Sequence, residues 1–389
     1  FTLALAWGIV YFLRRDFWNG VFSLNTTQGV AMFMIIWTSS AFSFWSMNQR
    51  VDFKYKKLVL ITAVSSVVSP VVCIALILNS DDKVSARIIG MAIVQVVFYA
   101  WTFLSQMVQG RQFFSKKYWI YALKFNLPLL PHYLSMHILS SSDRIMISSM
   151  VGDDKAGIYN LAHSVALIMT IFNTAMLQTL EPWIYRKLKA GKAMGIAKVA
   201  YPCFIGVASV NIVLILFAPE VIAVFAPIEY QEAIWTIPGV ALSVYFMFLY
   251  TFFATFEFYY EKTKYIAAAT VGGAVLNIVL NYLFIMKFGY IAAGYTTLFS
   301  YMVFAVLHYY FCNRICKEYM GGIRQYNLKI ILTISIGALI IGLSMLLLYP
   351  YTAVRYSVIA VVAVVAIIFR KRILDVVQMI MATKKENDS

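Results

Sequence analysis

Apolar runs alternate with short charged segments along the whole chain. A run of about 20 apolar residues is long enough for one helix to cross a lipid bilayer, and such runs normally end at charged clusters. The runs cover residues 1–13, 29–48, 58–78, 88–108, 127–150, 156–180, 199–218, 234–256, 266–286, 291–312, 330–349 and 354–369. The pattern predicts about twelve transmembrane helices. The first run is short, so we expect the sequence to lack its true N-terminus.

The amino-acid composition indicates which class of protein has this pattern. The chain has 389 residues, of which 62% are hydrophobic and 13% are charged, and its mean hydropathy is +0.77. Such a chain has too few polar side chains to cover a globule in water. The sequence therefore predicts an all-α, polytopic integral membrane protein.

Positive charge is concentrated in alternate loops. Of the 32 Lys and Arg residues, 24 fall in one set of alternate loops and the C-terminal tail, 7 fall in the other set, and Arg144 lies inside an apolar run. Cytoplasmic loops carry an excess of Lys and Arg, so the basic loops and the C-terminus are predicted to be cytoplasmic. Contact with anionic lipid then accounts for the net charge of +15, and no nucleic-acid partner is expected.

One basic segment divides the chain. Residues 109–126, "QGRQFFSKKYWIYALKFN", are basic and aromatic, which is typical of an amphipathic stretch lying at the membrane interface. We predict that this segment is a cytoplasmic linker between the remainder of an N-terminal bundle, residues 1–108, and a six-helix C-terminal bundle, residues 127–312. Two additional helices would occupy residues 313–370, and residues 371–389 would form a cytoplasmic tail.

Two motifs carry a resemblance to a known family. Residues 276–301, "LNIVLNYLFIMKFGYIAAGYTTLFSY", contain two spaced Asn residues, a Gly turn and a Gly/Ala-Thr-Ser helix. Residues 140–165, "SSSDRIMISSMVGDDKAGIYNLAHSV", contain an Asp-Arg pair, a Gly and a Gly-x-Tyr sequence. Together they resemble the polysaccharide transporter branch, the O-antigen and capsule repeat-unit flippases, of the multidrug/oligosaccharidyl-lipid/polysaccharide flippase superfamily.

The resemblance implies both a fold and a function. It implies two helical bundles around a central cavity, with about fourteen helices in the whole protein. It also implies a bacterial plasma (inner) membrane protein that moves oligosaccharide repeat units on undecaprenyl diphosphate to the outer leaflet. The lipid-linked glycan, membrane lipids, a polysaccharide polymerase and chain-length machinery would then be its partners. No cofactor is expected, and the coupling ion, proton or sodium, is left open.

The segment 127–150 contains two charged residues at membrane depth, Asp143 and Arg144. Helical spacing places His137, Ser141, Arg144 and Ser148 in one stripe, with Asp143 at its border. A charge in lipid costs at least about 2.5 kcal/mol, so the stripe should face protein or water. In one reading Arg144 binds sugar hydroxyls or diphosphate, and Asp143 is its partner or a cation or proton site. In the other reading the two residues only tie this helix to a neighbour.

The next helix carries a second polar stripe, formed by Asn160, His163, Thr170, Thr174 and Gln178. Hydroxyl, amide and imidazole groups suit a sugar substrate, and Tyr133 and Tyr159 would stack on pyranose rings. The alternative is that these residues hold helices together by hydrogen bonds. Similarly, the cations near the linker either bind the carrier diphosphate or only mark the cytoplasmic face; they are Arg111, Lys116, Lys117 and Lys124.

Other classes of function predict features that the sequence lacks. A multidrug or cation antiporter would need an acid-lined cavity, and most acids here lie in loops or near helix ends, including Glu257. A membrane-embedded glycan polymerase or acyltransferase would need a clustered catalytic set, so no enzyme is predicted. His308, Cys312 and Cys316 share one helix face without a recognisable fourth ligand, so no metal site is predicted.

Overall fold

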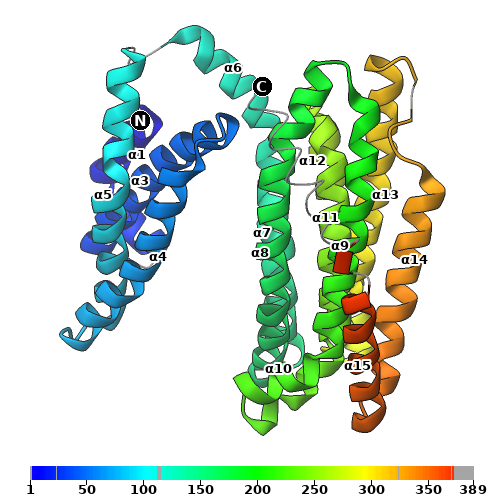
Figure 1. Ribbon diagram of the computed structural model, residues 1–389. Helices are drawn as coiled ribbons and strands as arrows, with labels where there is room; N and C mark the ends of the chain where they lie inside the picture. The colour runs from blue at the N-terminus through cyan, green and yellow to red at the C-terminus, as the bar shows by residue number, and fades with distance from the viewer. Residues whose placement is uncertain (1, 23, 112–114, 323, 369, 372–389) are drawn as a thin grey trace. The chain divides into compact units, whose positions relative to one another are not determined.

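A computed structural model describes residues 2–22, 24–111, 115–322, 324–368 and 370–371, which are helical apart from short connections. The chain divides into two compact units, Phe1–Trp119 and Ile120–Ser389 (Figure 1). Their boundary lies inside the basic segment 109–126. The finer division into bundles, linker and added helices stays a prediction, as does a cavity between the bundles. The predicted tail, residues 371–389, lies outside the described residues except for Lys371.

The first unit is built on three long helices. They are α3 (Thr26–Val51), α4 (Tyr55–Leu78) and α5 (Lys83–Gly110), and α5 packs against both of the others. The shorter α1 (Thr2–Leu13) and α2 (Arg15–Phe22) precede them, and α6 (Lys116–Asn126) follows and contains the boundary to the second unit. A capping box begins α3, because the Asn25 side chain accepts from the Gln28 amide while the Gln28 side chain accepts from the Asn25 amide.

The second unit contains the remaining helices, which run from η1 to α15. They are η1 (Leu127–Leu129), α7 (Leu130–Met150), α8 (Asp153–Lys189), η2 (Ala193–Gly195), α9 (Ile196–Leu216), α10 (Ala218–Phe225), η3 (Ile228–Trp235), α11 (Ile237–Tyr259), α12 (Thr263–Phe288), α13 (Ala292–Tyr319), α14 (Leu328–Ser344), η4 (Met345–Leu348) and α15 (Thr352–Ile368).

The predicted spans agree with these helices, because each of the predicted apolar runs coincides with one helix, or with a helix and its 3-10 extension. Within the described residues, 8 helices are long and apolar enough to cross a membrane. The chain is thus an all-helical, multi-pass membrane protein, as predicted. The sequence missed α2, α10 and η3, which occupy segments predicted as loops. These are too short or too polar to show the pattern of a spanning helix.

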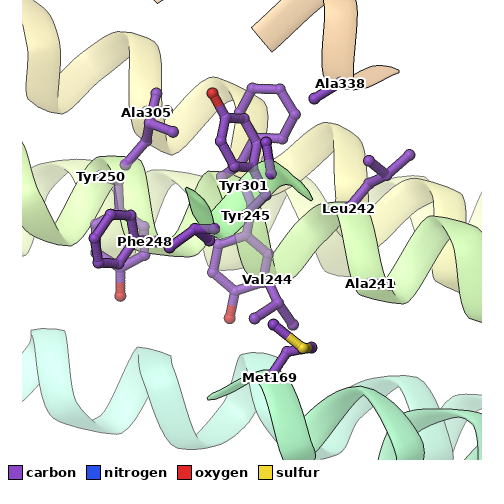
Figure 2. Packing of buried hydrophobic residues seen from close by; sticks show 14 of the residues in the cluster. Met169, Ala241, Leu242, Val244, Tyr245, Phe248, Tyr250, Tyr301, Ala305 and Ala338 are labelled. Atoms are coloured by element: carbon purple, nitrogen blue, oxygen red, sulfur yellow. The ribbon is translucent and has the colours of Figure 1, made fainter. Parts of the chain in front are cut away.

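The core of the second unit forms around α11, which packs against α13 and also against α8 and α9. Figure 2 shows Tyr245 and Phe248 of α11 between Met169 of α8 on one side and Tyr301 of α13 on the other. Tyr245 and Phe248 are fully buried. The Tyr245 hydroxyl also reaches Ser335 Oγ of α14 at 3.0 Å, which links α14 to this core.

A salt bridge and a hydrogen bond link the first turn of α8, η3 and the turn between α12 and α13. Lys155 Nζ of α8 lies 2.5 Å from Glu232 Oε2 of η3, and the Tyr290 hydroxyl donates to the same oxygen at 3.0 Å. The hydrogen bonds from Lys155 and Tyr290 lower the pKa of the Glu232 carboxyl. The pair is exposed to solvent, so its contribution to stability is small.

Two glycines allow α11 and α13 to approach closely. A Cβ added to Gly239 of α11 would lie 2.8 Å from the backbone carbonyl carbon of Gly294 on α13. No side-chain rotation relieves such a contact, because the neighbouring atom belongs to the backbone. Small residues at a crossing therefore set the distance between these helices, as they commonly do in membranes.

We expect Gly239→Ala to destabilise the protein by about 1 to 3 kcal/mol, because the methyl group must push α11 and α13 apart. The measurement is the melting temperature of the detergent-purified protein. Gly272→Ala on α12 is the matched control, since a Cβ there meets nothing within 4 Å. Equal melting temperatures for the two variants would contradict the role given to this crossing.

Candidate functional site

The two polar stripes predicted from the sequence lie on exposed or half-buried positions of α7 and α8. This set is called the α7–α8 polar face, and it consists of His137, Ser141, Arg144, Ser148, Asn160, His163, Thr170, Thr174 and Gln178. The opposite side of α8 is buried and mostly apolar, as Ala162, Val165 and Met169 illustrate. Exposed apolar side chains, such as Leu167 and Ile171 of α8, lie among these polar ones. The face is therefore mixed, and it differs from a purely lipid-facing surface in carrying a charge and several amide and hydroxyl groups.

Arg144 joins α7 to α8 within this face. Its Nη1 donates to Asn160 Oδ1 at 3.1 Å, and its Nη2 donates to the Ser140 carbonyl oxygen at 2.8 Å. Within the described part of the chain, the guanidinium forms no salt bridge with a carboxylate. A guanidinium has five N–H donors in a planar fork. Arg144 is therefore held in place by neutral partners and keeps donors available for an anionic or hydroxylated ligand.

Asp143 points to the other side of α7, into the interior of the second unit, where its side chain is buried. The Tyr159 hydroxyl donates to Asp143 Oδ2 at 2.6 Å, and Thr297 Oγ1 donates to the same oxygen at 2.8 Å. Asn281 Nδ2 donates to Asp143 Oδ1 at 2.6 Å. Three neutral donors from α8, α12 and α13 thus satisfy one carboxyl group on α7.

Further hydrogen bonds close this group into a network, which we call the Asp143 cluster. Asn281 Nδ2 also donates to Asn277 Oδ1 at 3.1 Å, and Asn277 Nδ2 donates to Thr297 Oγ1 at 3.1 Å. Thr296 Oγ1 donates to Asn281 Oδ1. The cluster consists of Asp143, Tyr159, Asn277, Asn281, Thr296 and Thr297. A buried carboxyl group is costly unless it is fully hydrogen-bonded, and this network supplies those bonds.

The two adjacent charges therefore have different surroundings. The described contacts of Asp143 are made with the cluster, and those of Arg144 are made with Asn160 and Ser140. The reading in which Asp143 pairs with Arg144 finds no support in this geometry. The expectation that Tyr159 stacks on a sugar is wrong, because its ring is 1% exposed. Tyr133 is 48% exposed.

The cations predicted near the linker are all exposed. Arg111 ends α5 with a left-handed backbone, φ 49°, and Lys116 and Lys117 begin α6. These three belong to the first unit, while Lys124, also on α6, belongs to the second. Their role in binding a carrier diphosphate stays a prediction.

His308 has a partner that the sequence did not indicate. Its Nδ1 lies 2.8 Å from Glu257 Oε1, and both side chains are fully buried between α11 and α13. Glu257 is therefore not a boundary acid facing water, as its place near a helix end suggests. In the part of the chain that the structure covers, no group of three or more His, Cys, Asp or Glu side chains is arranged to hold a metal ion.

The members of the Asp143 cluster on α12 and α13 were missed because they lie far away in the sequence, whereas Tyr159 lies only 16 positions from Asp143. Asn277, Asn281 and Thr297 are 134 or more positions from Asp143. A signal was nevertheless present, because Asn277 and Asn281 occupy i and i+4 positions in an otherwise apolar helix. Such an amide pair indicates a buried polar contact, although it does not identify the partner.

The fold and the polar side chains define a multi-pass, all-helical membrane protein with a polar face on one unit. Residues 13–187 match the protein family described as Polysaccharide biosynthesis protein, which confirms the resemblance drawn from the sequence motifs. The motif at residues 140–165 lies within the matched range, and the motif at 276–301 lies outside it.

Two proteins of Haemophilus influenzae are similar to this chain. A protein of the Lsg locus is 24% identical over 213 residues, which are 51% of this chain and 51% of that protein. An uncharacterised membrane protein is 24% identical over 197 residues, which are 49% of this chain and 48% of that protein. The chain spans about half the length of the curated relatives it matches. No solved structure matches the chain.

Proposed function

We propose that this protein is a flippase for lipid-linked oligosaccharides. It moves undecaprenyl-diphosphate-linked repeat units, of O-antigen or another surface polysaccharide, from the cytoplasmic to the outer leaflet of the bacterial plasma membrane by alternating access. Its C-terminus is cytoplasmic, and a polysaccharide polymerase and chain-length machinery act on its product. It is a transporter and catalyses no covalent chemistry.

The observation that carries this proposal is the position of Arg144 on the α7–α8 polar face. Its guanidinium is fixed by Asn160 and the Ser140 carbonyl, and it forms no salt bridge with a carboxylate in the described structure. Charged and amide groups face hydrocarbon only at a high cost, so this face borders water or a polar substrate. Hydroxyl, amide and imidazole groups around one cation suit a glycan that carries phosphate.

The proposed direction of transport, from the cytoplasmic to the outer leaflet, is favoured by the membrane potential. Moving negative charge out of a cell whose interior is negative is favourable by about 2.3 kcal/mol per charge per 100 mV. The export of a diphosphate is therefore assisted by the membrane potential without nucleotide hydrolysis. A proton or sodium ion would act as a coupling ion in addition to this contribution from the membrane potential.

A cation exporter of the same superfamily is less well supported. Such a protein would need a carboxylate open to a cationic substrate. Asp143, the acidic residue inside α7, is enclosed by Tyr159, Asn281 and Thr297. The α7–α8 polar face instead carries a cation in the form of Arg144.

We expect Arg144→Gln to reduce flipping about tenfold, because a charged hydrogen-bond donor is replaced by a neutral one. The measurement is the amount of lipid-linked glycan on each leaflet in cells that lack the native gene and express the variant. Deletion alone should cause repeat units to accumulate on the cytoplasmic leaflet. Lys189→Gln is the control, since Lys189 is an exposed cation at the end of the same helix α8.

The leaflet on which glycan accumulates separates the alternatives. Loss of a polymerase would leave single repeat units on the outer leaflet, and loss of a drug exporter would leave glycan unchanged. Either result after deletion would overturn the proposal. A wild-type rate of flipping by a folded Arg144→Gln protein would show that Arg144 has no role in transport.

A further inference from the structure

A groove runs along the surface of the second unit between α13 and α14, whose ribbons can be followed in Figure 1. Its volume is about 1040 Å³. Buried side chains of α11 form its floor, namely Phe246, Leu249 and Phe253. The groove is open at this position because α14 packs mainly against α9 and α11.

The walls of the groove are apolar and exposed along its length. Val306 and Tyr310 of α13 are 66% and 58% exposed, and Leu332 and Ile336 of α14 are 46% and 50% exposed. A side chain of this kind on a transmembrane helix faces lipid. The groove is therefore continuous with the bilayer, and acyl chains can enter it sideways.

The dimensions of the groove suit acyl chains. Its lining on α13 extends from Met302 to Lys317, which is about 22 Å at 1.5 Å per residue. The hydrocarbon of one leaflet is about 15 Å thick, half of the bilayer core. A lipid of one leaflet can thus lie along the groove with its headgroup at one end.

That end carries three cations, which we call the cationic mouth: Arg314, Lys317 and Arg324. All three are exposed, and none forms a salt bridge within the described residues. The nearby carboxylate of Glu318 is occupied by Lys262, with a distance of 2.8 Å between Nζ and Oε1. The Arg314 guanidinium lies over the Tyr265 ring at 5.4 Å, which restricts its position.

We propose that this groove binds an anionic diacyl phospholipid, with its acyl chains on the α11 floor and its phosphate at the cationic mouth. Apolar walls alone would accept any lipid, whereas three cations that form no salt bridge within the described residues select an anionic headgroup. The bound lipid also fills the side of α14 that faces α13. It is therefore expected to stabilise the docking of α14. This site is separate from the α7–α8 polar face and does not depend on the transport proposal.

The test is lipid binding by the purified full chain in detergent. The protein is titrated with phosphatidylglycerol or with phosphatidylcholine, and native mass spectrometry counts the lipids retained. We expect retention of phosphatidylglycerol and a higher melting temperature in its presence. Combined substitution of the cationic mouth, Arg314→Gln, Lys317→Gln and Arg324→Gln, should weaken phosphatidylglycerol binding about tenfold or more.

Two further variants distinguish the groove from general surface charge. Lys189→Gln, Lys192→Gln and Lys198→Gln together remove the same charge from exposed positions outside the groove lining and should leave binding unchanged. Ile336→Trp fills the groove while keeping the cationic mouth, and should also weaken binding. Equal retention of phosphatidylcholine, or full binding by the mouth variant, would overturn the proposal. So would displacement of phosphatidylglycerol by an equimolar polyprenyl phosphate, which would identify a prenyl lipid as the occupant.

Discussion

Asp143→Ala is expected to destabilise the protein by about 3 to 5 kcal/mol, because several buried donors lose their acceptor at about 1 to 3 kcal/mol each. The substitution leaves the Tyr159 hydroxyl, Asn281 Nδ2 and Thr297 Oγ1 without the acceptor they now share. All three groups are enclosed in the second unit, where few replacement acceptors are available. The measurement is the melting temperature in detergent together with the fraction of protein that remains monodisperse.

Asp143→Asn should be milder, at about 1 to 3 kcal/mol. Its amide oxygen still accepts from Tyr159 and Thr297, but its Nδ2 replaces the oxygen that accepts from Asn281. Asp154→Ala is the matched control, because Asp154 is an exposed carboxylate in the first turn of α8 and its loss should have little effect. A wild-type melting temperature for Asp143→Ala, accompanied by loss of transport, would instead make Asp143 an ion site. That result would restore the functional reading of this residue.

The spanning helices were predictable because, in a lipid bilayer, each one is determined by the apolar residues of its own segment. Each spanning helix satisfies its own backbone hydrogen bonds, and its length follows from the thickness of the hydrocarbon. The run 199–218 therefore predicts α9, Ile196–Leu216, within a few residues. The helices α10 and η3 obey no such constraint, since they lie in connections between spans. Their formation depends on packing against other parts of the unit.

The sequence could predict the candidate site only where the position of a side chain depends on its own helix alone. The spacing of Asn160, Thr174 and Gln178 places them on one side of α8 whatever the rest of the chain does, and the structure finds all three exposed. The surroundings of Asp143 depend instead on α8, α12 and α13, which no periodicity within α7 can indicate. Helical spacing indicates that Asp143 and Arg144 point about 100° apart. The hydrogen-bond donors to Asp143, however, come from other helices and are brought together only when the unit folds.

The Glu257–His308 pair illustrates the same limit and leads to the second large effect. Glu257→Ala is expected to destabilise the protein by about 3 to 5 kcal/mol, because His308 would lose its hydrogen-bond partner in a fully buried position. His308 also stacks on the Tyr250 ring, with 5.2 Å between ring centroids. Its orientation is thus held on two sides, and it has little freedom to turn toward another acceptor.

A double replacement tests whether the pair itself is needed. Well-packed apolar residues often replace a buried pair at little cost, since neither polar group then has to be desolvated. We therefore expect Glu257→Met with His308→Leu to recover much of the melting temperature that Glu257→Ala or His308→Ala loses. Additive losses in the double variant would contradict this account. A stable double variant that has lost transport would show that the pair is kept for its protons, which places a titratable site in the core between α11 and α13.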